Sequence, residues 1–240
     1  MNLAVMQPYF FPYLGYFHLL ESVDRFVIFD DVSYINRGWI NRNRIPIEGE
    51  VRYFTIPLRA ASQNRKINEI DIVEDGKWKK KMLRTFQTVY AKSPFKTEGM
   101  ALLERVIDSD SSKLVNYCVK SITEVAQYLE LKAVIVPTSS IYNNSSLKAQ
   151  ERIVDICVKE KSLRYVNLIA GKNLYHSEKF EKIGCDLKFI KSNFPAYSSS
   201  SKIFTPGLSI MDIIMNCEKG EIKKMMHSYI VLDANDIGEL

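Results

Sequence analysis

The sequence predicts an α/β fold in which a mainly parallel sheet is flanked by helices and carries a helical insertion or cap. Short apolar runs alternate with segments of helical spacing near both ends of the chain, which is typical of βαβ units. From residue 76 to residue 131 only helical spacing appears, so a helical block interrupts this alternation. We therefore expect a Rossmann-like domain whose two halves, 1–75 and 132–240, flank an insertion or cap over 76–131.

The segments before the helical block are short, rich in β-branched or aromatic residues, and separated by turn-forming residues. Pro12 interrupts the connection that follows the first strand, and a helix can begin directly after it. The expected strands are 3–6, 25–29, 51–58 and 67–73, and the expected helix is 13–22.

The helical block is predicted from apolar residues that recur on one helix face. Its longest segment, 113–131, carries Leu114, Cys118 and Ile122 at this spacing. Behind the block, strands and helices alternate again, as a parallel sheet requires. The expected helices are 79–91, 98–107, 113–131, 147–160, 177–183, 208–215 and 221–229, and the expected strands are 133–136, 165–169 and 187–190.

Composition excludes several classes of protein. A chain of 240 residues with 46% hydrophobic and 25% charged residues is ordinary for a globular protein with a sizeable core. No apolar run approaches the roughly 20 residues that span a bilayer. The start has no basic residue before Arg25, and Gln7, Pro8 and Pro12 interrupt any apolar run, so it is unlike a signal peptide. We expect a cytoplasmic protein without a transmembrane segment.

Charge and cysteine spacing limit the partners. A formal net charge of +5 suits a phosphorylated small substrate and does not by itself indicate DNA or RNA. The four cysteines are too far apart to predict a disulfide framework or a zinc site. The three histidines also lack metal-ligand spacing, and we expect no bound metal.

An unusual aromatic segment follows the first predicted strand, where α/β sheets bind their ligands. The amide of Gln7 could orient a ligand, or it could bond the loop backbone. Gly15 permits close approach of a phosphate to a helix start, or tight helix–strand packing. The aromatic residues could stack on a base or sugar, although most of them should be core. The aromatic candidates are Tyr9, Tyr13 and Tyr16.

Two acidic residues follow the second predicted strand. Asp30 or Asp31 could be a general base that deprotonates an amine or hydroxyl, or a helix or turn cap. Neighbouring side chains of an extended segment point in opposite directions, so only one of the two should face a site. His18, one turn into the first helix, is a further candidate for a general acid or base.

In the next segment two amides and three arginines, Arg37, Arg42 and Arg44, surround Trp39. Arg37 and Arg42 match phosphate geometry, and Trp39 offers a stacking face. The amides of Asn41 and Asn43 favour selective polar recognition. A solvated basic turn, or an RNA-binding cluster of interleaved basic and aromatic residues, is the alternative.

Two later segments could add phosphate contacts. Lys172 stands after Gly171 at the end of another predicted strand, where a cation can bind phosphate. The serine-rich segment 198–202 could close over a phosphate, although such loops are common.

These segments resemble the WbqC-like protein family, and the resemblance covers almost the whole chain. It implies a bacterial protein of surface-polysaccharide gene clusters of the O-antigen type, as in lipopolysaccharide biosynthesis. It also implies acyl or aminoacyl transfer to an amino sugar. The segments that carry the resemblance are 6–17, 30–34, 37–43, 151–153, 165–167, 171–175 and 208–212.

A more distant likeness concerns the HIGH superfamily of adenylyl-transferring enzymes. There, a strand leads into a His-x-Gly-His turn at a helix start. The present sequence keeps the glycine, Gly15, but has Tyr13 and Tyr16 in place of the histidines. Tyrosine can hydrogen-bond a phosphate but cannot present an imidazolium to developing negative charge. The likeness therefore favours a shared fold more than shared adenylation chemistry.

Three functions follow from these observations. The first is a transferase that N-acylates or aminoacylates a nucleotide-linked amino sugar, with ATP or an activated acyl donor as its co-substrate. In it, Arg37, Arg42 and Lys172 would hold phosphates, and Asp30 or Asp31 would take the proton of the amine. The second is a catalytically inert nucleotide-sugar-binding or scaffold protein. The third is nucleotidyl transfer or acyl-adenylate formation. The sequence leaves a homodimer open.

Overall fold

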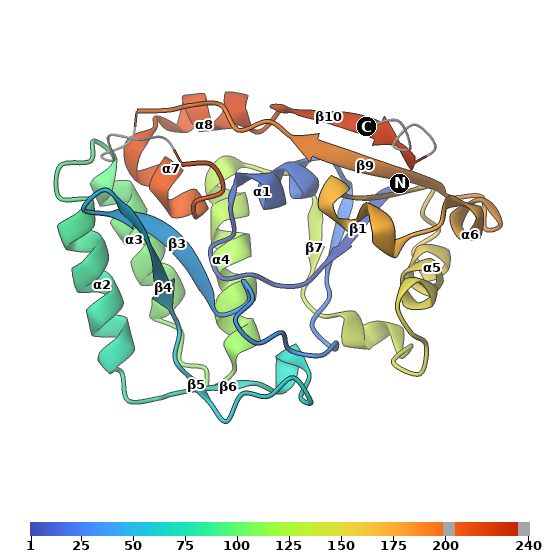
Figure 1. The fold of residues 1–240 in the computed structure, drawn as a ribbon, viewed down its shortest axis with the longest axis horizontal. Helices are drawn as coiled ribbons and strands as arrows, with labels where there is room; N and C mark the ends of the chain where they lie inside the picture. The colour runs from blue at the N-terminus through green and yellow to red at the C-terminus, as the bar shows by residue number, and fades with distance from the viewer. Residues whose placement is uncertain (199–204, 235–240) are drawn as a thin grey trace.

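The computed structural model describes residues 1–198 and 205–234. In this part of the chain a six-stranded sheet has the order β10–β9–β8–β1–β2–β7 (Figure 1). All neighbours are parallel except β9 and β10, which are antiparallel. The strands are β1 (Asn2–Met6), β2 (Arg25–Ile28), β7 (Val134–Val136), β8 (Arg164–Leu168), β9 (Asp186–Ser192) and β10 (Tyr229–Asp233).

The strand order determines where a ligand can enter. Counted along the chain within this sheet, the strands stand in the order 3-2-1-4-5-6, which is the order of doubly wound dinucleotide-binding folds. The order reverses between β1 and β8, and a crevice forms at the carboxyl ends of the strands at such a point. The predicted α/β class, with a mainly parallel sheet flanked by helices, is therefore confirmed.

Helices cover both faces of the sheet. On one face, α1 (Leu14–Glu21) and α4 (Leu114–Leu129) pack their apolar residues against β1, β2, β8 and β9. On the other face, α5 (Gln150–Lys159) and α6 (Ser177–Glu181) pack against the same sheet. Buried side chains such as Leu3 on one face and Ala4 on the other alternate along β1, as a strand covered on both faces requires.

The connection from β2 to β7 contains the predicted helical block together with small strands. These elements share a second core with α7 and α8 and lie on the left of Figure 1, away from α5 and α6. Their bounds are β3 (Arg42–Ile47), β4 (Glu50–Thr55), β5 (Leu58–Arg59), β6 (Asp71–Ile72), α2 (Lys77–Val89), α3 (Lys96–Ile107), α7 (Ile210–Asn216) and α8 (Lys219–Met225).

Helix α4 belongs to both cores. Tyr117 and Cys118 contribute to the core of the inserted elements, whereas Ile122 and Ala126 contribute to the core beneath the sheet. The helical block is thus packed directly on the sheet through α4. The domain boundaries at 75 and 131 stay a prediction.

Two strands differ from the sequence-based expectations. No strand was expected around Arg42, but this segment forms β3 and pairs with β4 in antiparallel register, with Arg44 opposite Tyr53. The last expected helix, 221–229, ends at Met225. Tyr229 begins strand β10, because the β-forming residues of this segment pair with β9. Each of these strands is recognised only once its pairing partner, β4 or β9, is known.

Two further observations complete the fold. The four cysteines are free and buried. Across residues 1–198 and 205–234, no helix combines the length and apolar character that a membrane crossing requires. Most of the serine-rich segment 198–202 lies outside the described residues.

Candidate functional site

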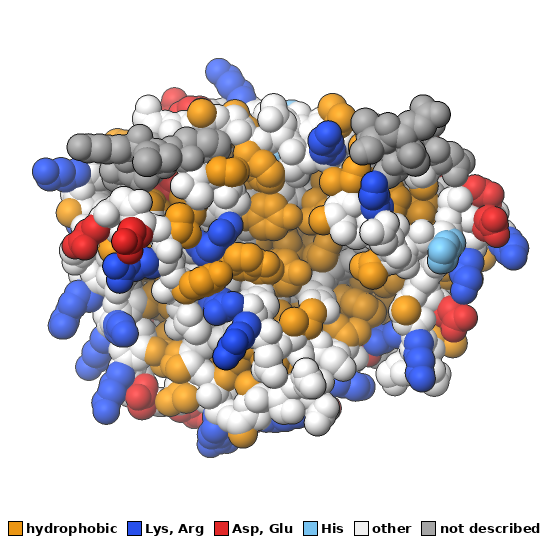
Figure 2. Space-filling model, in the orientation of Figure 1, with side chains coloured by type: hydrophobic (Ala, Val, Ile, Leu, Met, Phe, Trp, Pro, Cys, Tyr) orange, Lys and Arg blue, Asp and Glu red, His pale blue; other side chains and the backbone are white. Residues whose placement is uncertain are grey.

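A pocket of about 410 Å³ opens at the carboxyl ends of β1, β8 and β9. This is the place where the strand order of the sheet reverses. In the space-filling view the centre of this face is hollowed and hydrophobic, with Lys and Arg side chains at its margins (Figure 2). The volume lies within the roughly 300–1,000 Å³ that small-molecule sites occupy.

Five parts of the chain build the pocket wall. The segment after β1 contributes Tyr9 and Tyr13, and the end of β8 contributes Leu168 together with the two residues that follow it. Strand β9 contributes its last three residues, which are followed by Phe194. Strand β3 and the loop before it contribute Trp39, Asn43 and Arg44, and Pro206 and Gly207 close the wall before α7.

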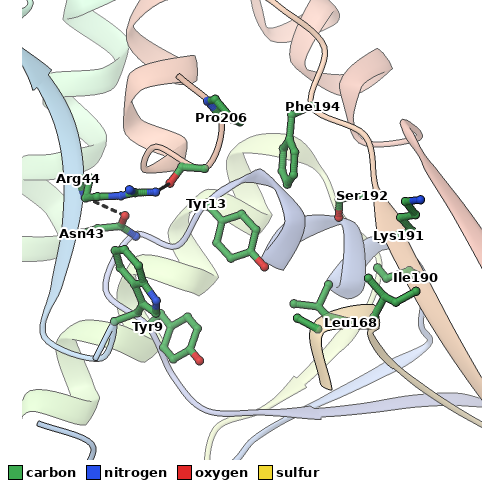
Figure 3. Close-up of a pocket in the computed structure, with 14 residues that line it drawn as sticks. Tyr9, Tyr13, Asn43, Arg44, Leu168, Ile190, Lys191, Ser192, Phe194 and Pro206 are labelled. Atoms are coloured by element: carbon green, nitrogen blue, oxygen red, sulfur yellow. Dashed lines mark hydrogen bonds between the residues drawn. The ribbon is translucent and has the colours of Figure 1, made fainter. Parts of the chain in front are cut away.

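Cations and tyrosines have distinct places in this wall. Arg44 and Lys191 stand on opposite sides of the pocket, and Tyr13 lies between them (Figure 3). Burial raises the pKa of Tyr13 to about 12, with a smaller contribution from Tyr9. Burial also raises the pKa of Tyr9. Both phenols therefore stay protonated at neutral pH and can donate hydrogen bonds to a ligand.

Gly15 sets the position of the Tyr13 ring. A Cβ atom at Gly15 would lie 2.5 Å from Cε2 of Tyr13 and 2.9 Å from Oγ of Ser192. The missing side chain thus lets the phenol ring and the end of β9 lie directly against the start of α1. Of the two roles predicted for Gly15, close packing has a visible geometric basis.

Asn43 and Arg44 connect β3 to two distant segments. Nδ2 of Asn43 donates to the carbonyl of Phe11 at 2.8 Å, and its Oδ1 accepts from the Arg44 backbone N–H at 2.8 Å. Nη2 of Arg44 donates to the carbonyl of Gly207 at 3.0 Å (Figure 3). The guanidinium carbon of Arg44 lies 5.0 Å from the ring centroid of Trp39. These bonds hold three walls of the pocket together.

Gln7 and Tyr16 lie outside the pocket wall. Tyr16 is fully buried in the core beneath the sheet, and its hydroxyl donates to the Gln7 carbonyl at 3.0 Å. Burial raises the pKa of Tyr16 well above its ordinary value. The phenol of Tyr16 is therefore neutral, and its proton is donated to the Gln7 carbonyl. The side chain of Gln7 is half-buried, and its part in binding stays a prediction.

Asp30 and Asp31 hold the segment after β7 and helix α5 against the end of β2. Asp30 accepts from Thr138 Oγ1 at 2.8 Å and from the Ser139 backbone N–H at 3.0 Å. Both carboxylate oxygens of Asp31 lie 2.7 Å from Nη2 of Arg152, and this ion pair is buried. Neither aspartate lines the pocket. The geometry gives them a structural role, and their catalytic role stays a prediction.

His18 is also enclosed by protein. Its ring is fully buried, and Nε2 donates to the Met225 carbonyl at 2.9 Å. Burial lowers the pKa of His18, so the imidazole is neutral at neutral pH. It lies outside the pocket wall, and its role as a general acid or base stays a prediction.

The remaining polar candidates are dispersed. Asn41 is buried and bonds Tyr34 Oη and the Ile56 carbonyl. Arg42 donates to the Gly38 and Arg37 carbonyls, and Arg37 itself is exposed. Lys172 lies in a separate hollow beside His176. None of the four predicted residues lines the main pocket, and their binding roles stay predictions.

Sequence reasoning found only part of the pocket. Four predicted residues, Tyr9, Tyr13, Trp39 and Asn43, line it together. Arg44 was noted in the basic segment but not selected. Residues near the end of β9, such as Lys191, were missed, although the rule about carboxyl strand ends could have indicated them. The described lining residues include no Asp, Glu or His.

Comparisons with known proteins extend over most of the chain. A family model described as the WbqC-like protein family matches residues 7–224, a range that includes every described residue of the pocket wall. Rv1507c, an uncharacterized protein of Mycobacterium tuberculosis, is 23% identical over 220 residues, which make up 90% of this chain and 93% of the relative. No solved structure matches the chain.

Proposed function

The chain belongs to the WbqC-like protein family, and on that premise we propose that it is a transferase of surface-polysaccharide biosynthesis. It N-acylates or aminoacylates a nucleotide-linked amino sugar. The observation that carries this proposal is the pocket at the point of strand reversal, with aromatic walls and a cation on each side. Aromatic walls suit sugar or base rings, and the cations suit phosphates.

The proposed reaction joins two ligands in one pocket. The amine of the sugar attacks the carbonyl of an activated acyl donor, either an acyl thioester or an acyl adenylate made with ATP. A new C–N bond forms, the donor's leaving group departs, and the amine loses a proton. Tyr9 and Tyr13, whose phenols stay protonated, are placed to donate hydrogen bonds to the oxyanion that develops on the carbonyl.

The proton of the amine needs an acceptor. Asp30 or Asp31, which follow the neighbouring strand β2, remains the proposed base, although both accept hydrogen bonds from protein groups. The described residues of the pocket wall include no carboxylate or imidazole. The main contribution of this wall to catalysis is therefore to hold the amine and the carbonyl in a reactive orientation.

A second candidate function is a nucleotide-sugar-binding protein without catalytic activity. The absence of Asp, Glu and His from the described pocket wall favours it. The two neutral tyrosines at the positions of the HIGH histidines also favour it over nucleotidyl transfer or acyl-adenylate formation. A phenol cannot carry the positive charge of an imidazolium, and the raised pKa values keep Tyr13 and Tyr16 neutral.

The test is product formation from defined substrates. The protein is incubated with nucleotide-linked amino sugars and either an acyl-CoA panel or amino acids with ATP, and products are identified by mass spectrometry. The proposal expects the mass of one acyl or aminoacyl group on the sugar amine. Binding without any product supports the second candidate, and pyrophosphate release without acyl transfer supports adenylation.

A matched pair of lysine variants ties the activity to the pocket. Lys191→Met removes a cation from the pocket wall, whereas Lys172→Met removes one from the separate hollow. We expect Lys191→Met to raise KM for the nucleotide sugar and Lys172→Met to leave it near the wild-type value. The opposite result would move the phosphate site to Lys172, as the sequence alone suggested.

A further inference from the structure

The outer face of the β3–β4 hairpin carries aromatic rings interleaved with arginines. Trp39 is 38% exposed and Tyr53 is 50% exposed. Their ring centroids lie 6.1 Å apart. The guanidinium carbon of Arg42 lies 4.2 Å from the Tyr53 centroid, and that of Arg44 lies 5.0 Å from the Trp39 centroid. We call Trp39, Arg42, Arg44 and Tyr53 the aromatic ledge.

Strand alternation produces this surface. Asn43 and Ile45 of β3 and Phe54 of β4 are buried on the inner face of the hairpin, so Arg42, Arg44 and Tyr53 lie on its outer face. The inner face alone joins the core. The exposed rings are therefore not needed to bury the hairpin, and large rings exposed together are typical of binding surfaces.

The arginines of the ledge are held in place by the backbone. Nε of Arg42 donates to the Gly38 carbonyl at 3.1 Å, and its Nη2 donates to the Arg37 carbonyl. Nη2 of Arg44 is fixed by the Gly207 carbonyl. No carboxylate pairs with either guanidinium among the described residues. The guanidinium groups of Arg42 and Arg44 are therefore held beside exposed rings without a carboxylate partner among the described residues.

We propose that the aromatic ledge binds the base of a nucleotide ligand and the phosphate next to it, while the adjoining pocket, with Lys191 in its wall, takes the sugar and the phosphate attached to it. The assignment rests on the proposed function and specifies which part of the substrate each surface takes. A nucleotide combines a planar ring with phosphates, and the ledge combines ring faces with arginines. Trp39 and Arg44 belong to both ledge and pocket wall, so the two subsites are continuous.

A single nucleotide fits better than a nucleic-acid strand. The ledge offers one pair of rings, 6.1 Å apart, and it adjoins a pocket of about 410 Å³. Proteins that bind single strands instead place several rings along an extended basic groove. RNA is therefore an outcome that the test must separate.

The test uses Trp39 as its own reporter. The chain has two tryptophans, and Trp78 is buried, so Trp78→Phe leaves Trp39 as the single indole. Nucleoside diphosphates with different bases are titrated against this variant, alongside an amino sugar 1-phosphate that has no base. We expect the diphosphates to quench Trp39 and to bind more tightly than the sugar phosphate, which has no base to stack on the ledge. Calorimetry on the wild-type protein repeats the comparison, so the result does not depend on whether the Trp78→Phe variant folds.

Variants of the hairpin complete the experiment. Tyr53→Ala removes a stacking face and should weaken diphosphate binding about tenfold, whereas Tyr53→Phe keeps the ring and the affinity. Arg52→Ala is the matched control. Arg52 neighbours Tyr53 on β4, has an exposed side chain paired with Glu50, and belongs to neither ledge nor pocket wall. Its removal should leave the affinity unchanged.

The outcomes separate this inference from the proposed function. If Tyr53→Ala leaves diphosphate binding unchanged but Tyr13→Ala abolishes it, the assignment of the base to the aromatic ledge is wrong. Product formation would still support the proposed transferase activity in that case. Ledge-dependent diphosphate binding without any acyl transfer upholds the ledge and overturns the transferase. No diphosphate binding overturns the ledge. Tighter, ledge-dependent binding of single-stranded RNA also overturns it.

Discussion

Asp31 and Arg152 form a buried ion pair that connects the end of β2 to helix α5. Breaking such a pair leaves an uncompensated buried charge, which costs roughly 3–5 kcal/mol. We predict that Arg152→Met lowers the free energy of unfolding by about this amount. Adding Asp31→Leu to the same chain should recover part of the loss. Urea unfolding of the single and double variants measures both effects.

The control for this prediction is an exposed pair. Arg52 and Glu50 are largely exposed, so Arg52→Ala should change the free energy of unfolding by less than about 1 kcal/mol. Asp31→Asn separates structure from catalysis. If this variant keeps wild-type stability but forms no product, the carboxylate acts in the reaction and its structural role is minor.

His18 predicts a pH dependence of stability. Its folded-state pKa lies below the ordinary 6.5 because the ring is buried. As the pH falls below that ordinary value, the unfolded chain takes up a proton that the folded protein does not, so the free energy of unfolding falls. Above it, His18 is neutral in both states and contributes no pH dependence.

The measurement compares urea unfolding at about pH 7.5 and about pH 5.5. The wild-type protein should lose more stability over this interval than His18→Gln, whose side chain does not titrate there. His176→Gln is the matched control, because His176 is exposed and its removal should leave the slope unchanged. Equal slopes in the wild type and His18→Gln would contradict the prediction.

At the scale of elements, the start of α1 depends on Gly15. Alanine there would bring Cβ to 2.5 Å from the Tyr13 ring, so the ring must move away from the helix. We predict that Gly15→Ala lowers stability and weakens nucleotide-sugar binding, because Tyr13 lines the pocket. Thermal unfolding and calorimetry measure the two effects.

Gly220 in α8 provides the opposite case. Its nearest neighbour for an added Cβ is a Glu218 oxygen at 3.5 Å, an ordinary contact. Gly220→Ala should raise stability by about 0.5–1 kcal/mol, since alanine loses less backbone entropy than glycine in a helix. A stabilising Gly15→Ala would show that the Tyr13 ring is not held against α1.

At the scale of the whole molecule, α4 joins the core of the inserted helices to the core of the sheet. Because α4 packs in both cores, unfolding of one core removes packing partners from the other. We predict a single unfolding transition, with tryptophan fluorescence and far-UV circular dichroism giving coincident urea midpoints. Two separated midpoints would instead show that residues 76–131 unfold as an independent unit.

The sequence was most informative where structure is local. Short apolar runs between helical segments predicted β1, β2, β7, β8 and β9. A parallel strand that is buried on both faces needs apolar residues regardless of which strands lie beside it. Strand β3 was missed although its partner β4 follows directly, because only one face of β3 is buried. Arg42 and Arg44 face outward, so the segment has the composition of a basic turn until β4 pairs with it.

The candidate site shows the same division. The segment after β1 indicated Tyr9 and Tyr13 because a ligand site at a strand end is a local rule. Lys191 and Gly207 join the pocket only because the fold brings the end of β9 and the segment before α7 to the segment that follows β1. The sequence also could not show that Asp31 is engaged by Arg152, which lies 121 residues away.

The sequence by itself determined the α/β class, the first strand and its aromatic segment, and the resemblance to the WbqC-like family, since periodicity and motifs are properties of neighbouring residues. The tertiary structure decided which of those residues meet. It placed Arg44 beside Trp39, Tyr53 and Gly207, and it directed both aspartates into buried bonds. Contacts between distant segments depend on strand order and on packing across two cores, and no local pattern encodes them.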